Sequence, residues 1–499
     1  MTIKTLGELK ASGYRSETVK EELRRNLIKQ LQNKEAGFEG IVGYEDTVIP
    51  DLQTAILSQH NILLLGLRGQ AKTRIARLMI NLLDEYVPYI EGAELFDDPL
   101  NPISWYGRNQ IELHGDETPV AWLHRSERYT EKLATPDVTV ADLIGDVDPI
   151  KAASLKLTYS DERVIHFGLI PRAHRGIFVI NELPDLQARI QVALFNILQE
   201  KDIQIRGFKL RLPLDVQFVF TANPEDYTNR GSIVTPLKDR IESQILTHYP
   251  RSIEISRKIT QQEARLTSQQ RESIEADGLV KDLVEQIAFE ARGSEYIDKK
   301  SGVSARLTIT AYENLISNAE RRMLLNGEKR TTVRIADFLG VIPAITGKIE
   351  LVYEGEQEGP SKVAHILIGK AIKTLMAQYF PDPEKLKKSK AVNPYNEILN
   401  WFAAGNSINL VDDLPEKEYK AALNSIPGLK SVVKQFHPAL SENQQFLLME
   451  FLLHGLSEFS QISKSFLDNG FTFKDMFGSL FSSPFDEEDE EDDFNDDRY

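Results

Sequence analysis

Cysteine is absent from this chain of 499 residues. Disulfides, thiolate metal sites and cysteine nucleophiles are therefore excluded, and the absence fits a reducing compartment. No stretch approaches the ~18 uninterrupted apolar residues that a membrane span needs. The first residues also lack the apolar segment of a signal peptide. We therefore expect a protein of the cytoplasm that has no membrane partner.

Positive charge is also scarce, because 59 Lys and Arg stand against 75 Asp and Glu. A broad nucleic-acid surface is usually basic, so nucleic acid is not an expected partner. More than half of the net charge of −16 lies at the end of the chain, where residues 486–499 carry a net charge of −9. Such a run repels itself and buries no apolar surface, so we expect residues 481–499 to be a disordered acidic tail. This tail is either a solubilising end or an interaction segment for a basic partner.

At 499 residues the chain exceeds what one hydrophobic core usually serves, so we expect two or three domains. Hydrophobic patterning divides residues 1–480 into four parts. Residues 1–40 predict a helical extension, in which Thr18 and Glu21 have the spacing of a capping box. In residues 41–250, apolar β-type runs alternate with helical stretches, which predicts an α/β fold with a parallel sheet between helices. The expected strands are 61–65, 87–91, 177–181, 216–222 and 244–249, and a hairpin is expected at 202–212. Helical periodicity then predicts a lid over 251–355 and a separate helical domain over 356–480.

A phosphate-binding loop is predicted directly after the first strand. Its residues are Gly66, Gly69, Gln70, Ala71, Lys72 and Thr73. Backbone N–H groups of such a loop surround phosphate oxygens, the lysine reaches the β- and γ-phosphates, and the threonine hydroxyl ligates Mg²⁺. Ala71 stands where the usual pattern has its last glycine, and a glycine turn without a ligand would share much of this pattern. The predicted ligands are ATP and Mg²⁺.

A second apolar strand ends in Asn181 and Glu182, about a hundred residues after the loop. In a P-loop ATPase this strand lies beside the loop, and its last residues hold the Mg²⁺ shell and polarise the attacking water. Glu182 occupies the general-base position, and Asn181 occupies the metal position. An asparagine accepts a hydrogen bond from a Mg²⁺-bound water but adds no negative charge. ATP binding is therefore expected, while the hydrolysis rate is left open.

These motifs resemble those of AAA+ ATPases, and within them the magnesium-chelatase ATPase subunit and its MoxR-type relatives. Ala71 is the residue that MoxR-type loops carry before the lysine. The run 172–176 (Arg-Ala-His-Arg-Gly) is similar to a chelatase phrase that leads into the same strand. That family ends the strand in Asp-Glu, so Asn181 departs from it.

The resemblance implies roles for three further residues. Asn223 falls at the polar sensor position, although alone it would equally fit an Asn-Pro turn. Arg240 falls at the arginine finger, which reaches the ATP of a neighbouring subunit and so implies a ring, expected to be a hexamer. A surface arginine at a helix end is the alternative for this residue. Arg306 resembles the second sensor, with Arg321 and Arg322 as rivals.

The resemblance implies a ring-forming ATPase that couples Mg·ATP hydrolysis to remodelling, activation or metal-insertion work on a partner protein. Insertions within about 105–167 and at the 202–212 hairpin contact substrate or partner in relatives. Such relatives act with a separate protein that bears a von Willebrand factor A domain. An alternative is a nucleotide-gated assembly protein with slow or no turnover, as Asn181 suggests. A sigma-54-dependent activator would share the core, but its Gly-Ala-Phe-Thr-Gly-Ala loop is absent.

Overall fold

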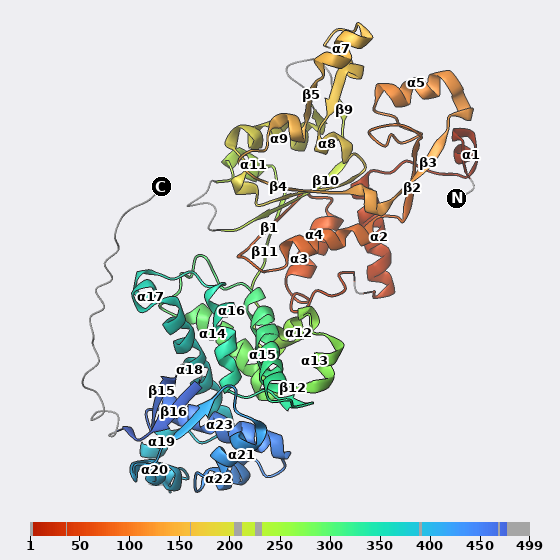
Figure 1. Ribbon diagram of the computed structural model, residues 1–499. Helices are drawn as coiled ribbons and strands as arrows, with labels where there is room; N and C mark the ends of the chain where they lie inside the picture. Colours follow the sequence, from red (N-terminus) through yellow and green to blue (C-terminus); the bar gives the residue numbers. More distant parts are fainter. Residues whose placement is uncertain are drawn as a thin grey trace. The chain divides into compact units, whose positions relative to one another are not determined.

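The computed structural model describes residues 3–35, 37–159, 161–203, 212–224, 232–388, 392–467 and 470–476 (Figure 1). The chain divides into two compact units, Met1–Arg251 and Ser252–Tyr499. The expected hairpin is described at its base, where β8 (Asp202–Ile203) pairs antiparallel with β9 (Leu212–Pro213). Its tip, and the acidic tail expected at 481–499, lie outside the described residues.

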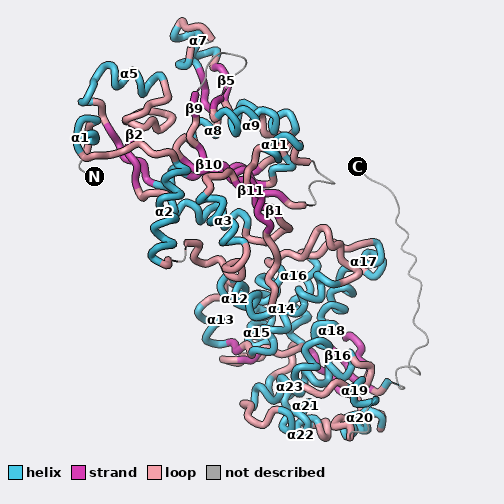
Figure 2. Tube along the Cα trace, turned by 180° about the vertical axis from the view of Figure 1, so that it is seen from behind, coloured by secondary structure: helices cyan, strands magenta, loops and turns pink. Residues whose placement is uncertain are grey.

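A five-stranded parallel sheet forms the centre of the first unit (Figures 1 and 2). Its strands are β1 (Ile62–Leu65), β4 (Tyr129–Leu133), β7 (Gly176–Asn181), β10 (Val216–Ala222) and β11 (Ser243–Leu246). They lie in the order β11-β1-β10-β7-β4, and every neighbouring pair is parallel. The carboxyl ends of all five strands therefore meet at one edge. The expected α/β fold with a parallel sheet is confirmed.

Side chains alternate between the two faces of this sheet, and each face has its own hydrophobic core. Leu64 and Val179 are buried on one face, while Leu63 and Phe178 are buried on the other. The first face is covered by α2 (Val19–Asn33), α3 (Val48–Leu57) and α4 (Lys72–Leu78), and the second by α9 (Ala188–Glu200) and α11 (Thr235–Asp239). Burial on both sides explains why the central strands are continuous apolar runs. The capping box expected at Thr18 starts α2.

The strand expected at 87–91 does not join the parallel sheet. As β2 (Tyr86–Ile90) it pairs antiparallel with β3 (Val120–His124) in a separate two-stranded ribbon. Pro88 lacks an N–H donor and therefore suits an edge strand. This proline argued against a central strand, but the apolar run around it suggested one. The fifth strand of the sheet is instead β4, whose side chains are half-buried or exposed because it lies at the edge.

The segment 105–167, expected as an insertion, therefore contains a strand of the central sheet. After β4 the chain forms a small projection in which β5 (Gly145–Val147) pairs antiparallel with β6 (Ile165–Phe167). The helix α7 (Pro149–Leu155) lies between these two strands in the chain. Insertion of residues between the second and third strands of the sheet is thus observed, and it lies within the expected range.

The second unit is mainly helical and is built around one continuous hydrophobic core. Its longest helices are α14 (Gly278–Gly293), α15 (Arg306–Leu325), α18 (Pro360–Tyr379) and α23 (Glu442–Glu458). The core includes residues from both 251–355 and 356–480, the ranges expected as a lid and a separate domain. A small antiparallel sheet was not expected, and it has the order β14 (Ile408–Val411), β16 (Gly470–Lys474), β15 (Ser463–Leu467). Among the described helices, none is long and apolar enough to cross a membrane.

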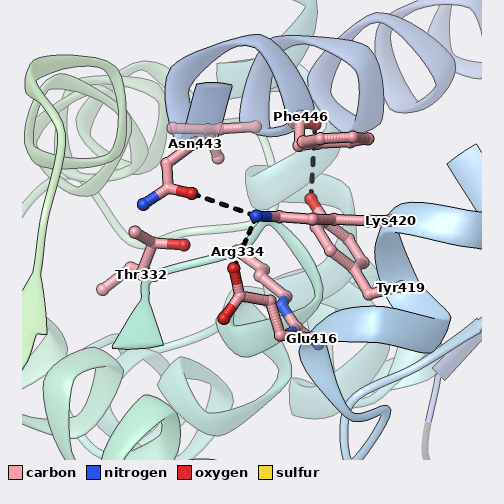
Figure 3. A pocket seen from close by; sticks show the side chains of 9 residues that line it. Thr332, Arg334, Glu416, Tyr419, Lys420, Asn443 and Phe446 are labelled. Atoms are coloured by element: carbon pink, nitrogen blue, oxygen red, sulfur yellow. Dashed lines mark hydrogen bonds and ion pairs between the residues drawn. The ribbon is translucent and has the colours of Figure 1, made fainter. Parts of the chain in front are cut away.

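A small hollow in the second unit is too narrow for a ligand. Figure 3 shows Lys420 directed toward Glu416 and Asn443, with nitrogen to oxygen distances of 2.6 and 3.4 Å. The guanidinium carbon of Arg334 lies 4.1 Å from the centre of the Tyr419 ring. The hollow encloses about 10 Å³, which is room for one water-sized group.

Candidate nucleotide-binding site

The predicted phosphate loop joins the end of β1 to the start of α4. Gly69 and Ala71 both adopt positive φ, at 76° and 58°, so the chain turns sharply before the helix. A Cβ atom on Gly66 would clash with the Thr247 hydroxyl oxygen and with Gln70 Oε1, so any larger residue would force these side chains to move. The loop therefore has the tight turn, directly before a helix N-terminus, that phosphate binding requires.

The ammonium group of Lys72 lies inside this loop. Only 7% of Lys72 is exposed, and Nζ donates to the carbonyl oxygens of Gly66 and Leu67, the second at 3.0 Å. Nζ also donates to Asn223 Oδ1 at 2.6 Å, at the end of β10. The loop and the predicted sensor residue are therefore joined through the lysine.

Asn223 continues this chain of contacts to the predicted general base. Its Nδ2 donates to Glu182 Oε2 at 2.9 Å. Glu182 follows β7 with φ of 55°, and its backbone N–H donates to the Thr221 hydroxyl at 3.1 Å. The structure thus brings Lys72, Asn223 and Glu182 together at the carboxyl edge of the sheet, where ligands of parallel α/β sheets bind.

The predicted metal residues also lie side by side. The hydroxyl of Thr73 donates to Asn181 Oδ1 over a long 3.4 Å, and the hydroxyl of Thr221 donates to the same oxygen at 3.1 Å. The other end of the amide, Asn181 Nδ2, donates to Glu131 Oε1 at 2.6 Å. Sequence reasoning missed Glu131, because it lies on β4, the strand that was not expected in the sheet.

Glu131 is held as a carboxylate by several donors. Arg77 donates to both of its oxygens, at 2.8 and 3.0 Å, and Tyr129 donates to Oε2 at 3.1 Å. Partial burial alone would raise the pKa of Glu131, but the hydrogen bonds from Arg77, Tyr129 and Asn181 together hold the pKa below its usual value. Glu131 is therefore ionised at neutral pH.

The donor set suits Mg²⁺ bound together with a nucleotide. Magnesium prefers oxygen ligands, keeps several waters and commonly relies on substrate phosphates. Thr73 and Asn181 offer oxygens of this kind, and Glu131 and Glu182 are nearby carboxylates. Within the described ranges, no three His, Cys, Asp or Glu side chains cluster as a metal site without a nucleotide. The residues therefore fit a metal that arrives with phosphate oxygens.

A clamp from β11 and the segment before α3 holds the phosphate loop, and sequence reasoning assigned it no role. The hydroxyl of Thr247 donates to Gln70 Oε1 at 2.7 Å. The hydroxyl of Tyr44 bridges the backbone oxygens of Gln70 and His248, at 3.1 and 2.7 Å, and burial raises the pKa of Tyr44 to about 12. The sequence offered no signal for this contact, because the burial of the Tyr44 hydroxyl, which requires a partner, is visible only in the folded structure.

The predicted finger, Arg240, lies at the end of α11. Its side chain donates to Gln199 Oε1 at 3.0 Å and to the Pro236 backbone oxygen at 2.7 Å, and it lies 5.0 Å from the Phe195 ring centre. These contacts come from α9 and α11. Its expected role toward a neighbouring subunit stays a prediction.

The candidates for the second sensor differ in accessibility. Arg322 is 1% exposed and pairs with Asp337 at 2.9 Å inside the second unit, so it cannot reach a phosphate. Arg321 pairs with Asp413 at 2.7 Å near the surface. Arg306 begins α15 and is exposed. Arg306 stays the predicted sensor.

The chelatase-like run 172–176 contacts β2, the segment after β2 and the segment before β10. Arg175 donates to the Pro88 backbone oxygen at 2.7 Å and lies 3.3 Å from Asp98. His174 is buried, and its Nδ1 accepts the backbone N–H of Asp215 at 3.1 Å. Burial, and then the charge of Arg175, lower the pKa of His174 to about 3. These residues organise the amino edge of the sheet, opposite the phosphate loop.

Comparison with known proteins agrees with this description. A family model for the Sigma-54 interaction domain, an AAA+ domain, matches residues 156–245. The 38 kDa subunit of magnesium chelatase from Cereibacter sphaeroides is 27% identical over 226 residues, which covers 44% of this chain and 60% of that protein. The chain thus spans less than two thirds of the length of this relative.

Two solved structures are among those to which the chain is similar. A complex of the BchI and BchD subunits of magnesium chelatase has a TM-score of 0.34 and 19% identity, covering 64% of this chain and 98% of that one. A protein described as an ATPase from Cytophaga hutchinsonii has a TM-score of 0.28 and 18% identity, covering 72% and 97%. Both scores are below 0.5, so the AAA+ fold rests on strand order and sequence matches. The resemblance to AAA+ proteins and to the magnesium-chelatase subunit is confirmed, and the MoxR-type likeness stays a prediction.

Proposed function

We propose that this chain, which carries an AAA+ domain similar to that of a magnesium-chelatase subunit, is a Mg-dependent ATPase that remodels or activates a partner protein. The observation that carries the proposal is the continuous contact from Lys72 through Asn223 to Glu182. It links the proposed phosphate-binding lysine to the proposed general-base carboxylate across three parallel strands, β1, β10 and β7. Phosphoryl transfer to water needs a group that binds the phosphates and a group that positions the attacking water, and this contact places candidates for both side by side.

Each residue has a distinct role in the proposed reaction. The phosphate loop and Lys72 bind the β- and γ-phosphates, replacing the loop carbonyl contacts of the lysine with phosphate contacts. Glu182 accepts the proton of the attacking water, and Asn223 orients that carboxylate and the water. Bound Mg²⁺ supplies positive charge that offsets the charge on the phosphate oxygens. Thr73 and Asn181 are the residues that would hold it.

Assembly and partners follow from the resemblance and are proposals as well. Arg240 acting in trans requires a ring, which we propose to be a hexamer. The partner protein on which the ATPase acts would be a separate chain, and the candidate is a protein with a von Willebrand factor A domain. A MoxR-like activity, metal insertion and a cytoplasmic location remain predictions of the same kind.

A nucleotide-gated assembly protein is the second candidate, and Asn181 favours it. The residue places an amide where the related family has an aspartate. Binding without turnover would still need Lys72, but it would not need Glu182.

Steady-state phosphate release separates the two candidates. Lys72→Ala is expected to abolish nucleotide binding, whereas Glu182→Gln should retain binding and lower turnover by ~100-fold or more, as removal of a general base does. Glu94→Gln is the matched control, because Glu94 forms an exposed pair with Arg172 at 2.8 Å. If the wild type releases phosphate no faster than Glu182→Gln, the ATPase proposal is excluded and the assembly protein is the remaining candidate function.

A further inference from the structure

We propose that Glu131 is a positioning residue for the magnesium side of the nucleotide site, so that β4 supplies the carboxylate that β7 lacks. The proposal rests on the proposed function, because it assigns Glu131 a role toward bound Mg·ATP. It concerns a contact between two neighbouring strands of the sheet, whose register pairs Leu133 with Asn181. No sequence motif pointed to this residue.

The orientation of the Asn181 amide is the first step of the argument. A carboxylate only accepts hydrogen bonds, so the end of the amide that faces Glu131 at 2.6 Å must be the NH₂ group. The amide oxygen consequently faces Thr73 and Thr221. Thr73 is the residue whose hydroxyl ligates the metal in phosphate loops. Glu131 therefore determines that an oxygen, and not an N–H group, points toward the metal position.

The charge arrangement explains why an asparagine is tolerated at 181. An aspartate would place a second carboxylate oxygen where Asn181 Nδ2 now lies, within hydrogen-bond distance of Glu131. Two carboxylates at that separation repel one another. The pair therefore keeps one negative charge and one amide, with the charge on β4 and the amide on β7. The related family has the carboxylate on the strand that corresponds to β7.

The supports of Glu131 connect it to the phosphate-loop helix. Arg77 lies one turn after Thr73 on α4 and donates to both carboxylate oxygens. The Arg77 side chain is 63% exposed, so the ion pair alone contributes little stability. Its geometric effect is larger, because it orients Glu131 so that Oε1 faces Asn181. Hydrogen-bonded partners of this kind typically change metal affinity by ~10- to 100-fold.

The test measures magnesium-dependent nucleotide binding and needs no turnover. The dissociation constant of a fluorescent, non-hydrolysable ATP analogue is determined in EDTA and in excess Mg²⁺, and the ratio of the two is the magnesium effect. Glu131→Gln has one acceptor oxygen for four donor groups, two from Arg77 and one each from Tyr129 and Asn181. We therefore expect its magnesium effect to fall ~10-fold while binding in EDTA stays unchanged. Asn181→Asp alone should also lose the effect and should melt at a lower temperature than the wild type, because its carboxylate opposes that of Glu131.

Exchanging the two groups is the decisive variant. In Glu131→Gln with Asn181→Asp, the glutamine amide on β4 donates to the aspartate on β7, so the magnesium effect should return to within about threefold of the wild type. Glu94→Gln should leave the effect unchanged, and Arg77→Ala should reduce it less than Glu131→Gln does.

Several results would overturn the assignment of Glu131. These are a full magnesium effect in Glu131→Gln, no recovery in the folded double variant, an equal loss in Arg77→Ala, or faster hydrolysis by Asn181→Asp alone. A wild type that binds no nucleotide would instead overturn the proposed function.

Discussion

Replacing Asn223 tests the link between the predicted phosphate loop and the proposed general base, Glu182. The side chain accepts from Lys72 Nζ at 2.6 Å and donates to Glu182 Oε2 at 2.9 Å. Both partners are ionisable, and a hydrogen bond to a charged group contributes ~1.5–3 kcal/mol. Asn223→Asp keeps the contact with Lys72, but it replaces the contact with Glu182 by two facing carboxylates. Asn223→Ala removes both contacts.

The expected consequences of the two substitutions differ. A loss of ~1.5–3 kcal/mol at Glu182 corresponds to a rate that is ~10- to 100-fold lower, because each 1.36 kcal/mol is a factor of ten. Asn223→Asp should therefore hydrolyse ATP more slowly while its nucleotide affinity changes by less than about threefold. Asn223→Ala should lose both rate and affinity. The difference arises because only the aspartate retains the contact with the lysine.

Two assays distinguish these outcomes. Phosphate release at saturating ATP gives kcat, and titration of a fluorescent ATP analogue gives affinity. Asn409→Asp is the matched control, because Asn409 is exposed on β14 in the second unit. The reasoning is refuted if Asn223→Asp turns over ATP at the wild-type rate, or if it loses affinity as strongly as Asn223→Ala.

Three further predictions address the loop, the amino edge of the sheet and the second unit. Gly66→Ala should weaken binding of the ATP analogue by ~10-fold or more, because the new Cβ displaces the loop at a strain of ~1–3 kcal/mol. Unchanged affinity in the titration would contradict the close approach of Thr247 and Gln70 to Gly66. Burial raises the pKa of Asp215 to about 6, so the folded protein holds this proton more tightly than the unfolded chain and loses stability as the pH rises from about 4 through 6. Asp215→Asn should therefore gain up to ~3 kcal/mol relative to the wild type between pH 4 and pH 8 in urea unfolding, and parallel pH profiles would speak against it. Arg322→Met should lower the free energy of unfolding by ~3–5 kcal/mol, because it leaves the buried Asp337 carboxylate unpaired. Arg321→Met, at the surface, should lower it by less than ~1 kcal/mol. Similar losses for the two variants in urea unfolding would refute this contrast.

Local patterns were sufficient for the phosphate loop and for the strand that ends in Asn181 and Glu182. Both are strand-to-turn transitions, in which a buried apolar run is followed by residues of unusual backbone conformation. The order of these strands in the sheet was also consistent with the resemblance. Such features are encoded over a few consecutive residues, and so they are visible without a structure.

The edge of the sheet was the part that local patterns misjudged. The run 87–91 is apolar, yet β2 forms a separate ribbon, whereas the polar sequence of β4 occupies the edge of the sheet. An edge strand packs on fewer neighbours than a central strand, so its sequence need not be apolar. The polarity of β4 therefore concealed both the strand and Glu131.

The residue order alone predicts a nucleotide loop of the AAA+ type, and it shows a glutamate after the neighbouring strand and an amide where the related family has an aspartate. Only the tertiary structure shows which carboxylate lies beside Asn181, the position that lacks the family's negative charge. Glu131 and Asn181 are 50 residues apart in the chain, and they meet because β4 and β7 are parallel neighbours. A contact across strands depends on register, and register is set by the packing of the whole sheet.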